Sequence, residues 1–302
     1  KLLFFFLCTV FLSHAGAQQQ SLDAYYAFIN KAELCIIQEK PDSSSYFFKR
    51  GFAHVPYPFA RHVYNAAVVD ASLKRFGNVY EYLKYILELG YAFDSLSHAP
   101  AFKDFFISPV GMKLLHNRPE PIYNPDYRKA INKMVADDQF FRVKSHSYKM
   151  YGDTIQKIDK RNVDELLHLI QQYGFPSESK VGVDPGSLTH PLYSAIIIHQ
   201  SKGVEQRYNF EKLLLENILR GNIENKAGDY LVKRAIGANT EVVYKVVHVK
   251  VIDAPKSIGN SNNHIVLEAS GYGFLPESLE KREKIDLRRK ELYLDTYDEN
   301  LQ

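Results

Sequence analysis

The stretch DKRNVDELLHLIQQYG, from Asp159 to Gly174, is the clearest helical pattern in the chain. Asn162 with Glu165 forms a capping-box-like start, Gly174 suits the left-handed position that ends a helix, and Pro176 blocks continuation. The apolar residues recur at i, i+3, i+4 and i+7, which is one face of a helix: Val163, Leu166, Leu167 and Ile170. This stretch predicts an amphipathic helix packed on a core.

The same period continues on both sides of this stretch and predicts a helical domain over residues 119–302. Its start is set by Arg118-Pro119-Glu120-Pro121, because closely spaced prolines cannot continue a helix. Further helices are predicted over residues 125–149, 190–200, 204–220, 226–236 and 276–297.

The period changes after Asn239, where apolar and polar residues alternate. Alternation is typical of a half-buried strand, and it predicts a small antiparallel β-hairpin near residues 243–270. The apolar positions of the two strands are Val247, Val249 and Val251, and then Ile265, Leu267 and Ala269.

Residues 18–118 are predicted to form helical hairpins, with helices over residues 24–39, 43–53, 59–73 and 79–89. The two hairpins are offset by about 35 residues, which is near the length of a tetratricopeptide repeat. Small and bulky residues recur at this offset: Ala32, Ala66, Ala67, Phe48 and Leu83. We therefore expect a repeat-like array, with another helical hairpin packing as the alternative, and a mainly α fold overall.

Residues 1–17 have the pattern of a secretory signal peptide. Lys1 precedes an apolar run from Leu2 to Leu12, and the segment ends in the small-x-small site Ala15-Gly16-Ala17. The run is too short to span a bilayer as a helix. The pattern predicts export to the periplasm, the cell envelope or the outside of the cell, with no transmembrane segment in the mature chain.

The composition excludes several classes of function. Removing Lys1 with the signal lowers the 38 basic residues to 37 against 35 acidic ones, so the mature chain is close to neutral and argues against nucleic acid as a partner. Cys35 would be the only mature cysteine, which excludes an intramolecular disulfide. The spacing of the histidines predicts no metal site, Ser187 and Ser194 lack the frame of a serine hydrolase, and no cofactor motif is found.

Asp138, Arg142, His199 and Arg234 are the candidate site residues. Asp138 and Arg142 are i, i+4 partners on a stripe that should face protein, where unpaired charges are costly. They could pair with each other and fix the packing of helices. Alternatively they line a cleft, where Arg142 and Arg234 bind an anionic group and His199 moves a proton.

Several short motifs resemble a bacterial family of exported proteins, common in Bacteroidota, with a C-terminal domain of unknown function behind repeat-like helices. The resemblance covers residues 120–297. It implies this fold but no reaction, because the family has no assigned activity. The chain departs from the family at Ile198 and Lys233, which replace a Gln and an acidic residue. The motifs are Asp138-Gln139 with Arg142, Ile158-Asp159 with Asn162, Gly174-Phe175-Pro176, Val181-Gly182, His199, Gly221 with Ile223, and Tyr230-Leu231 with Arg234.

The sequence predicts an exported binding protein of the bacterial envelope, with a protein or peptide partner on the N-terminal helical array. The alternative is an enzyme, such as a hydrolase of an anionic envelope component, with a cleft built from Asp138, Arg142 and His199. The basic cluster from Arg288 to Lys290 is predicted to be a solvated helix face, with a phosphate- or membrane-directed role as the alternative.

Overall fold

The structure is a computed structural model that describes residues 2–200, 208–236, 246–248, 272–274, 283, 286, 287, 289 and 290. The predicted mainly α-helical fold is confirmed over these residues. Among them, no helix combines the length and apolarity that are needed to cross a membrane.

The N-terminal half is a series of helices in which each packs on the next: α1 (Leu2–Ile37), α2 (Pro41–Phe52), α3 (Ala60–Ser72) and α4 (Phe76–Glu88). The helix α1 is continuous across the predicted cleavage point after Ala17. Pro41 begins α2, where its missing N–H would have no partner in any case. Buried side chains of the first three helices form a shared core that includes Tyr25, Ile29, Phe48 and Ala66.

Shorter helices continue this half: α5 (Phe93–Ser97), the 3-10 helix η1 (Pro100–Phe102), α6 (Lys103–Phe106) and α7 (Pro109–His116). Ser108 caps α7, because its hydroxyl accepts a hydrogen bond from the backbone N–H of Gly111 at 3.1 Å. A second core joins these helices to α3 and α4 through residues such as Phe102, Phe105 and Leu114.

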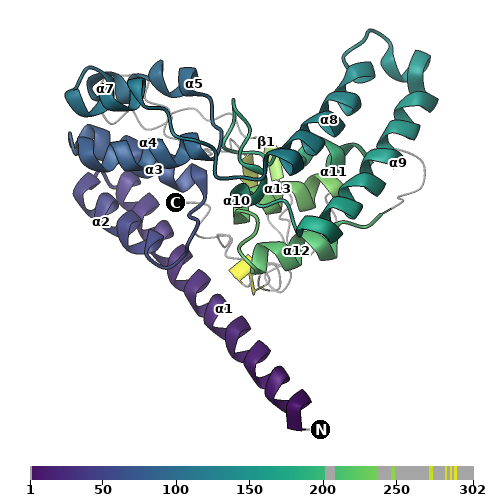
Figure 1. The fold of residues 1–302 in the computed structure, drawn as a ribbon, viewed down its shortest axis with the longest axis horizontal. Helices are drawn as coiled ribbons and strands as arrows, with labels where there is room; N and C mark the ends of the chain where they lie inside the picture. The colour runs from purple at the N-terminus through teal and green to yellow at the C-terminus, as the bar shows by residue number, and fades with distance from the viewer. Residues whose placement is uncertain are drawn as a thin grey trace.

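The C-terminal half is α8 (Pro125–Arg142), α9 (Ser147–Tyr173), α10 (Glu178–Val181), α11 (Ser194–Gln200), α12 (Glu211–Leu219) and α13 (Asn225–Ile236). Asn124 caps α8, since its Oδ1 accepts hydrogen bonds from the backbone N–H groups of Asp126 and Tyr127, each at 3.0 Å. A third core fills this half, with Ile131, Leu166, Leu214 and Leu231 at its centre. Figure 1 shows α2 to α7 on one side, the α8–α9 hairpin projecting on the other, and α10 between them.

Several predicted helix boundaries are wrong, and two of them lie in the α8–α9 hairpin. The helix predicted to run to Lys149 ends at Arg142, because His146 takes the left-handed conformation, with φ 53°, and turns the chain. The helix predicted to start at Asp159 starts at Ser147, so Asn162 is not a cap. Its Nδ2 instead donates to the carbonyl of Met134 at 2.9 Å, between α9 and α8. A tertiary contact therefore uses a side chain that is locally typical of a helix start.

Two strands of three residues, β1 (Val246–His248) and β2 (Tyr272–Phe274), pair antiparallel with Val247 opposite Gly273. The hairpin predicted near residues 243–270 is not supported. Its second strand, residues 265–269, lies outside the described residues, and the segment that pairs with β1 comes after it. Alternation identifies a strand but does not choose its partner.

Arg128 of α8 joins the two halves of the molecule. Its Nη1 donates to the carbonyl of Val181 at 3.0 Å and its Nη2 to that of Val183 at 2.9 Å, while Nη1 lies 3.4 Å from the carbonyl of Leu89. Between these carbonyls Gly182 has φ +74°, and a Cβ added there would stand 2.3 Å from the Leu89 oxygen. Only glycine fits, and α10 is thereby fixed against the end of α4.

Candidate functional site

The structure brings together Asp138, Arg142 and His199. Arg142 Nη1 donates to Asp138 Oδ1 at 2.7 Å, and its Nη2 contacts both carboxylate oxygens of Asp159 at 2.6 and 2.7 Å. From α11, Nδ1 of His199 lies 2.7 Å from Asp138 Oδ2, which also accepts a hydrogen bond from Gln139 Nε2 at 2.6 Å. These contacts link α8, α9 and α11. We call the five residues the charged cluster.

The charged cluster is mostly withdrawn from solvent. The side chains of Asp138, Arg142 and His199 are 1%, 7% and 20% exposed. Every oxygen of the Asp138 carboxylate has a partner. Because Oδ2 of Asp138 accepts the hydrogen bond from Nδ1 of His199, Nε2 is the ring atom left to exchange a proton with a substrate. The side chain of Arg234, the other predicted ligand-binding residue, lies outside the described residues.

A hollow, which we call the junction groove, lies where the two halves of the chain meet. Its volume is about 480 Å³, within the usual range of about 300–1,000 Å³ for small-molecule sites. Its lining from the N-terminal half is Ser21, Leu22, His54, Val55, Pro56, Tyr57, Phe59 and Tyr85. The C-terminal half contributes Ser177, Glu178, Ser179, Arg220, Gly221 and Asn222.

The junction groove is a better candidate for a binding site than the other large hollow, because its walls come from both halves of the chain. A hollow of about 680 Å³ lies along α9, but its lining from Asp153 to Glu165 comes from that one helix. In the junction groove, by contrast, rings from one half face polar groups from the other. Tyr57 in its wall is 56% exposed, so part of its aromatic ring is open to a ligand.

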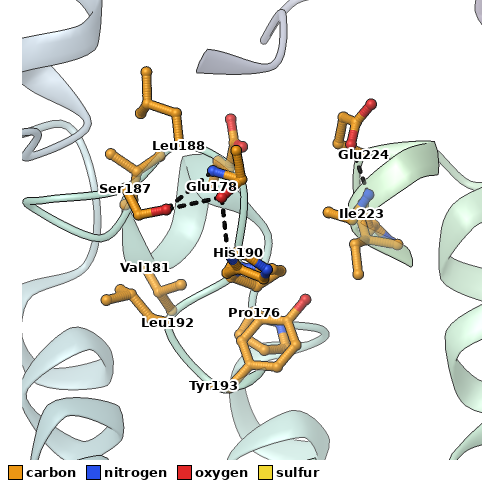
Figure 2. A pocket seen from close by; sticks show the side chains of 16 residues that line it. Pro176, Glu178, Val181, Ser187, Leu188, His190, Leu192, Tyr193, Ile223 and Glu224 are labelled. Atoms are coloured by element: carbon orange, nitrogen blue, oxygen red, sulfur yellow. Dashed lines mark hydrogen bonds between the residues drawn. The ribbon is translucent and has the colours of Figure 1, made fainter. Parts of the chain in front are cut away.

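A smaller hollow, the inner cavity, shares lining residues with the groove, and Figure 2 shows its lining. Its volume of about 30 Å³ is room for only a water or two, since one water needs about 10–15 Å³. Glu178 and Asn222 line both hollows. In Figure 2 the carboxyl groups of Glu178 and Glu224 point to the same side, away from Leu192 and Tyr193. This inner cavity cannot hold a substrate, but it brings two carboxyl groups to one place.

Glu224 pairs with two basic residues of α3. One oxygen lies 3.8 Å from Nη1 of Arg61 and accepts the backbone N–H of Ala227 at 2.7 Å, while the other lies 3.5 Å from Nε2 of His62. Burial opposes ionisation of Glu224, but the charge of Arg61 and the contacts of His62 and Ala227 outweigh it and lower its pKa to about 2. Glu224 is therefore charged at neutral pH. Behind it, the hydroxyl of Tyr25 lies 2.7 Å from Nδ1 of His62.

Glu178 has the opposite electrostatic environment. Its Oε2 accepts a hydrogen bond from the backbone N–H of Ala60, the first residue of α3, at 2.7 Å. Burial raises the pKa of the Glu178 carboxyl to about 7, a rise that the Ala60 N–H opposes and the charge of Glu224 reinforces. The two carboxyl groups of the junction therefore differ strongly in acidity.

Further contacts across the junction involve α1. The hydroxyl of Tyr26 accepts a hydrogen bond from the backbone N–H of Asn225 at 3.1 Å, and Nζ of Lys226 lies 3.3 Å from Oε2 of Glu33. These contacts tie the start of α13 to the N-terminal half. The walls of the junction groove are consequently held in a fixed relation to each other.

Comparison with known proteins gave no relative. The chain matched no protein-family model, no curated protein and no solved structure. The resemblance of residues 120–297 to an exported bacterial family stays a prediction, and the function rests on the geometry.

Sequence reasoning missed the residues of the junction. One signal was available: α3 carries Arg61, His62, Asn65 and Asp70 in an otherwise apolar sequence, and all four are buried. Buried polar residues on an apolar helix require partners. For Arg61 and His62 the partner is Glu224, from the other half of the chain, whereas Asp70 is paired within its own half by Ser45 and Asn78. Nothing in the local sequence marks Glu178 or Glu224 as residues of the junction.

The remaining predicted features do not form a site. Among the described residues no group of three or more His, Cys, Asp or Glu side chains could hold a metal ion. Arg289 is only 5% exposed, and its Nη1 lies 3.7 Å from Oδ1 of Asp229, so the predicted solvated face is wrong for this residue. Lys290 is exposed, and Arg288 lies outside the described residues.

Proposed function

We propose that this protein is an exported binding protein of the bacterial envelope and that an extended peptide segment of a partner protein occupies the junction groove. The observation that carries the proposal is a hollow of about 480 Å³ whose walls come from both halves of the chain. A groove of this size takes a few residues of an extended chain. Rigid walls reduce the ordering cost of binding, which favours a preformed site.

The lining chemistry fits a peptide. Tyr57 and Tyr85 offer ring surfaces and Pro56 lines the same wall, and such surfaces accept the side chains of extended or proline-containing segments. On the other wall Ser177, Ser179 and Asn222 can exchange hydrogen bonds with peptide N–H and C=O groups. The two ionisable groups of the lining, Glu178 and Arg220, would set the direction of the bound chain.

The helical array also supports a binding role. The helices α1 to α4 pack consecutively, and we infer that they form two tetratricopeptide-like hairpins. Arrays of this kind present extended surfaces to partners, and two units need a neighbouring structure to cover the end of the stack. In this protein α10 and the α12–α13 turn would provide that cover and line the groove at the same time.

Selected peptides test the proposal directly. The chain contains no Trp, so the fluorescence of a single Trp in a short peptide reports binding without background from the protein. Peptides selected from a random library should bind wild type, and Tyr57→Ala should weaken binding roughly tenfold, because exposed aromatic side chains dominate peptide interfaces. Tyr46→Ala is the matched control, since Tyr46 of α2 is 55% exposed and lies outside the groove, against 56% for Tyr57. Equal loss in both variants would count against the groove.

A second function is favoured by one specific observation, the distance of 2.7 Å between Nδ1 of His199 and Oδ2 of Asp138. A buried carboxylate that orients an imidazole is half of the arrangement by which His acts as a general base. His199 would then serve a hydrolase of an anionic envelope component. His199→Gln and Arg142→Gln separate the two roles: an unchanged melting temperature keeps the catalytic role, whereas a large loss in both assigns the charged cluster to stability.

A further inference from the structure

The turn between α8 and α9 exposes a group of large apolar side chains. Phe140, Val143, Tyr148 and Met150 are 58%, 78%, 60% and 66% exposed. We call residues 139–152 the hairpin tip. Single exposed apolar residues are ordinary, but a group of them close together in one turn indicates a surface that contacts something else.

The charge of the hairpin tip is of one sign. Residues 139–152 contain no Asp or Glu, while Lys144, His146 and Lys149 are exposed. Arg142 belongs to the charged cluster and is neutralised there by Asp138 and Asp159. The basic groups that remain lie among the exposed apolar side chains, so the tip is both apolar and basic.

The tip has an ordered arrangement of its side chains. Nζ of Lys144 lies 4.2 Å from the ring centre of Phe140, 4.7 Å from that of Phe141 and 5.3 Å from that of Tyr151. The rings of Phe141 and Tyr151 are 5.1 Å apart. These contacts hold the lysine against the rings at the surface of the turn.

The hairpin tip protrudes from the molecule, so it can contact a broad surface. Figure 1 shows the α8–α9 turn at the end of a hairpin that projects away from the other labelled helices. A stable protein interface buries about 800 Å² on each partner. A protruding turn with lysines beside aromatic and aliphatic side chains matches the interface of a bilayer, where lysines keep their charge in water.

We propose that the hairpin tip docks on the surface of a bilayer that contains anionic lipids. Val143, Met150 and the ring of Phe140 enter the boundary between headgroups and acyl chains. Lys144 and Lys149 lie at the level of the lipid phosphates, where opposite charges attract them. This contact anchors the protein at its surface without a spanning helix, and it is independent of the junction groove.

Vesicle flotation tests the proposal with the protein from Gln18 onward, the predicted mature form, which keeps every described core residue. Wild type should float with phosphatidylcholine vesicles that contain phosphatidylglycerol and much less with phosphatidylcholine alone. Lys144→Gln with Lys149→Gln should weaken binding about 30-fold, because each lysine near an anionic surface contributes roughly a fivefold factor. Val143→Glu should reduce binding further.

The matched controls are Ile107→Glu and Lys113→Gln, which change an apolar residue 75% exposed and an exposed lysine outside the tip. They should bind like wild type. Equal binding of tip and control variants overturns the proposal, as does a failure of wild type to float. If wild type ignores vesicles but forms a dimer that Val143→Glu dissolves, the tip docks on protein and the proposal is wrong.

Discussion

Oε2 of Glu178 lies 2.7 Å from the backbone nitrogen of Ala60, so a side chain of α10 accepts a hydrogen bond from the first N–H of α3. The start of a helix leaves N–H groups without internal partners, and here a carboxyl group from a distant part of the chain takes one of them. The same carboxyl group lines the junction groove and the inner cavity. The joint between the halves and the candidate site therefore share one titratable residue.

The pKa of Glu178 predicts a loss of stability as the pH rises. The folded value of about 7 lies above the ordinary 4.5, so between these values the folded protein holds a proton that the unfolded chain has released. This contribution is present below pH 4.5 and is lost as the pH rises through 7. Denaturant unfolding over this range should show a smaller decline in Glu178→Gln than in wild type. Glu81→Gln, on the exposed side of α4, should keep the full decline.

The pKa of Glu224 predicts the opposite dependence at acid pH. Its folded value of about 2 lies below the ordinary 4.5, so the stability it contributes is present above pH 4.5 and is lost as the pH falls toward 2. Glu224→Gln should remove this acid-sensitive part. At neutral pH it should also cost roughly 3 kcal/mol, because it takes the carboxylate from the buried Arg61. A variant as stable as wild type at neutral pH would refute the electrostatic role of this pair.

Neighbouring aspartates of α8 test the charged cluster. Asp138→Ala should destabilise the protein by roughly 3–5 kcal/mol, since it deprives the buried Arg142 and His199 of a partner. Asp137→Ala removes a carboxylate 32% exposed, which pairs with Lys133 and Arg161 at the surface, and should cost less than about 1 kcal/mol. Urea unfolding of both variants measures the difference. Similar costs would mean that burial does not govern these pairs.

Two glycines near α10 test the packing that fixes its position. Gly182→Ala places a side chain at φ +74° and 2.3 Å from both Leu89 O and Arg128 Nη1, so it should cost roughly 3 kcal/mol or more. Gly186→Ala meets only Asp184 Oδ1, at 3.6 Å, and should change stability by less than about 1 kcal/mol. Thermal melts of the two variants measure the difference in stability. If Gly182→Ala has the same melting temperature as wild type, the loop can move away from Arg128.

The local parts of the fold could be predicted from the sequence. The end of α9 at Gly174, with φ +79°, follows from one residue and its neighbours, and so does the apolar face that carries Leu166. The beginning of α9 could not be predicted in this way. Asn162 has the local character of a cap, but Met134 lies close enough in the fold to take its hydrogen bond.

The candidate sites, like the fold, could be predicted from the sequence only where the contacts are local. Asp138 and Arg142 are one helical turn apart, so their contact can be predicted from their spacing. The local sequence around Asp159 predicts a helix start, and it does not indicate that Asp159 is a partner of Arg142. The junction groove depends on pairs such as Ala60 with Glu178 and Arg61 with Glu224, which are far apart in the chain. No local pattern brings such pairs together, because the packing of whole helices decides which of them meet.

Hydrogen exchange with a bound peptide tests the central claim most directly. A peptide selected for binding to wild type should slow exchange of the amides of Val55 and Tyr57, on one wall of the junction groove, and of Gly221 and Asn222, on the other. Protection should appear on both walls together and be lost in Tyr57→Ala at the same peptide concentration. Protection confined to one wall, or found only outside the groove, would contradict the claim that the peptide binds between the two halves.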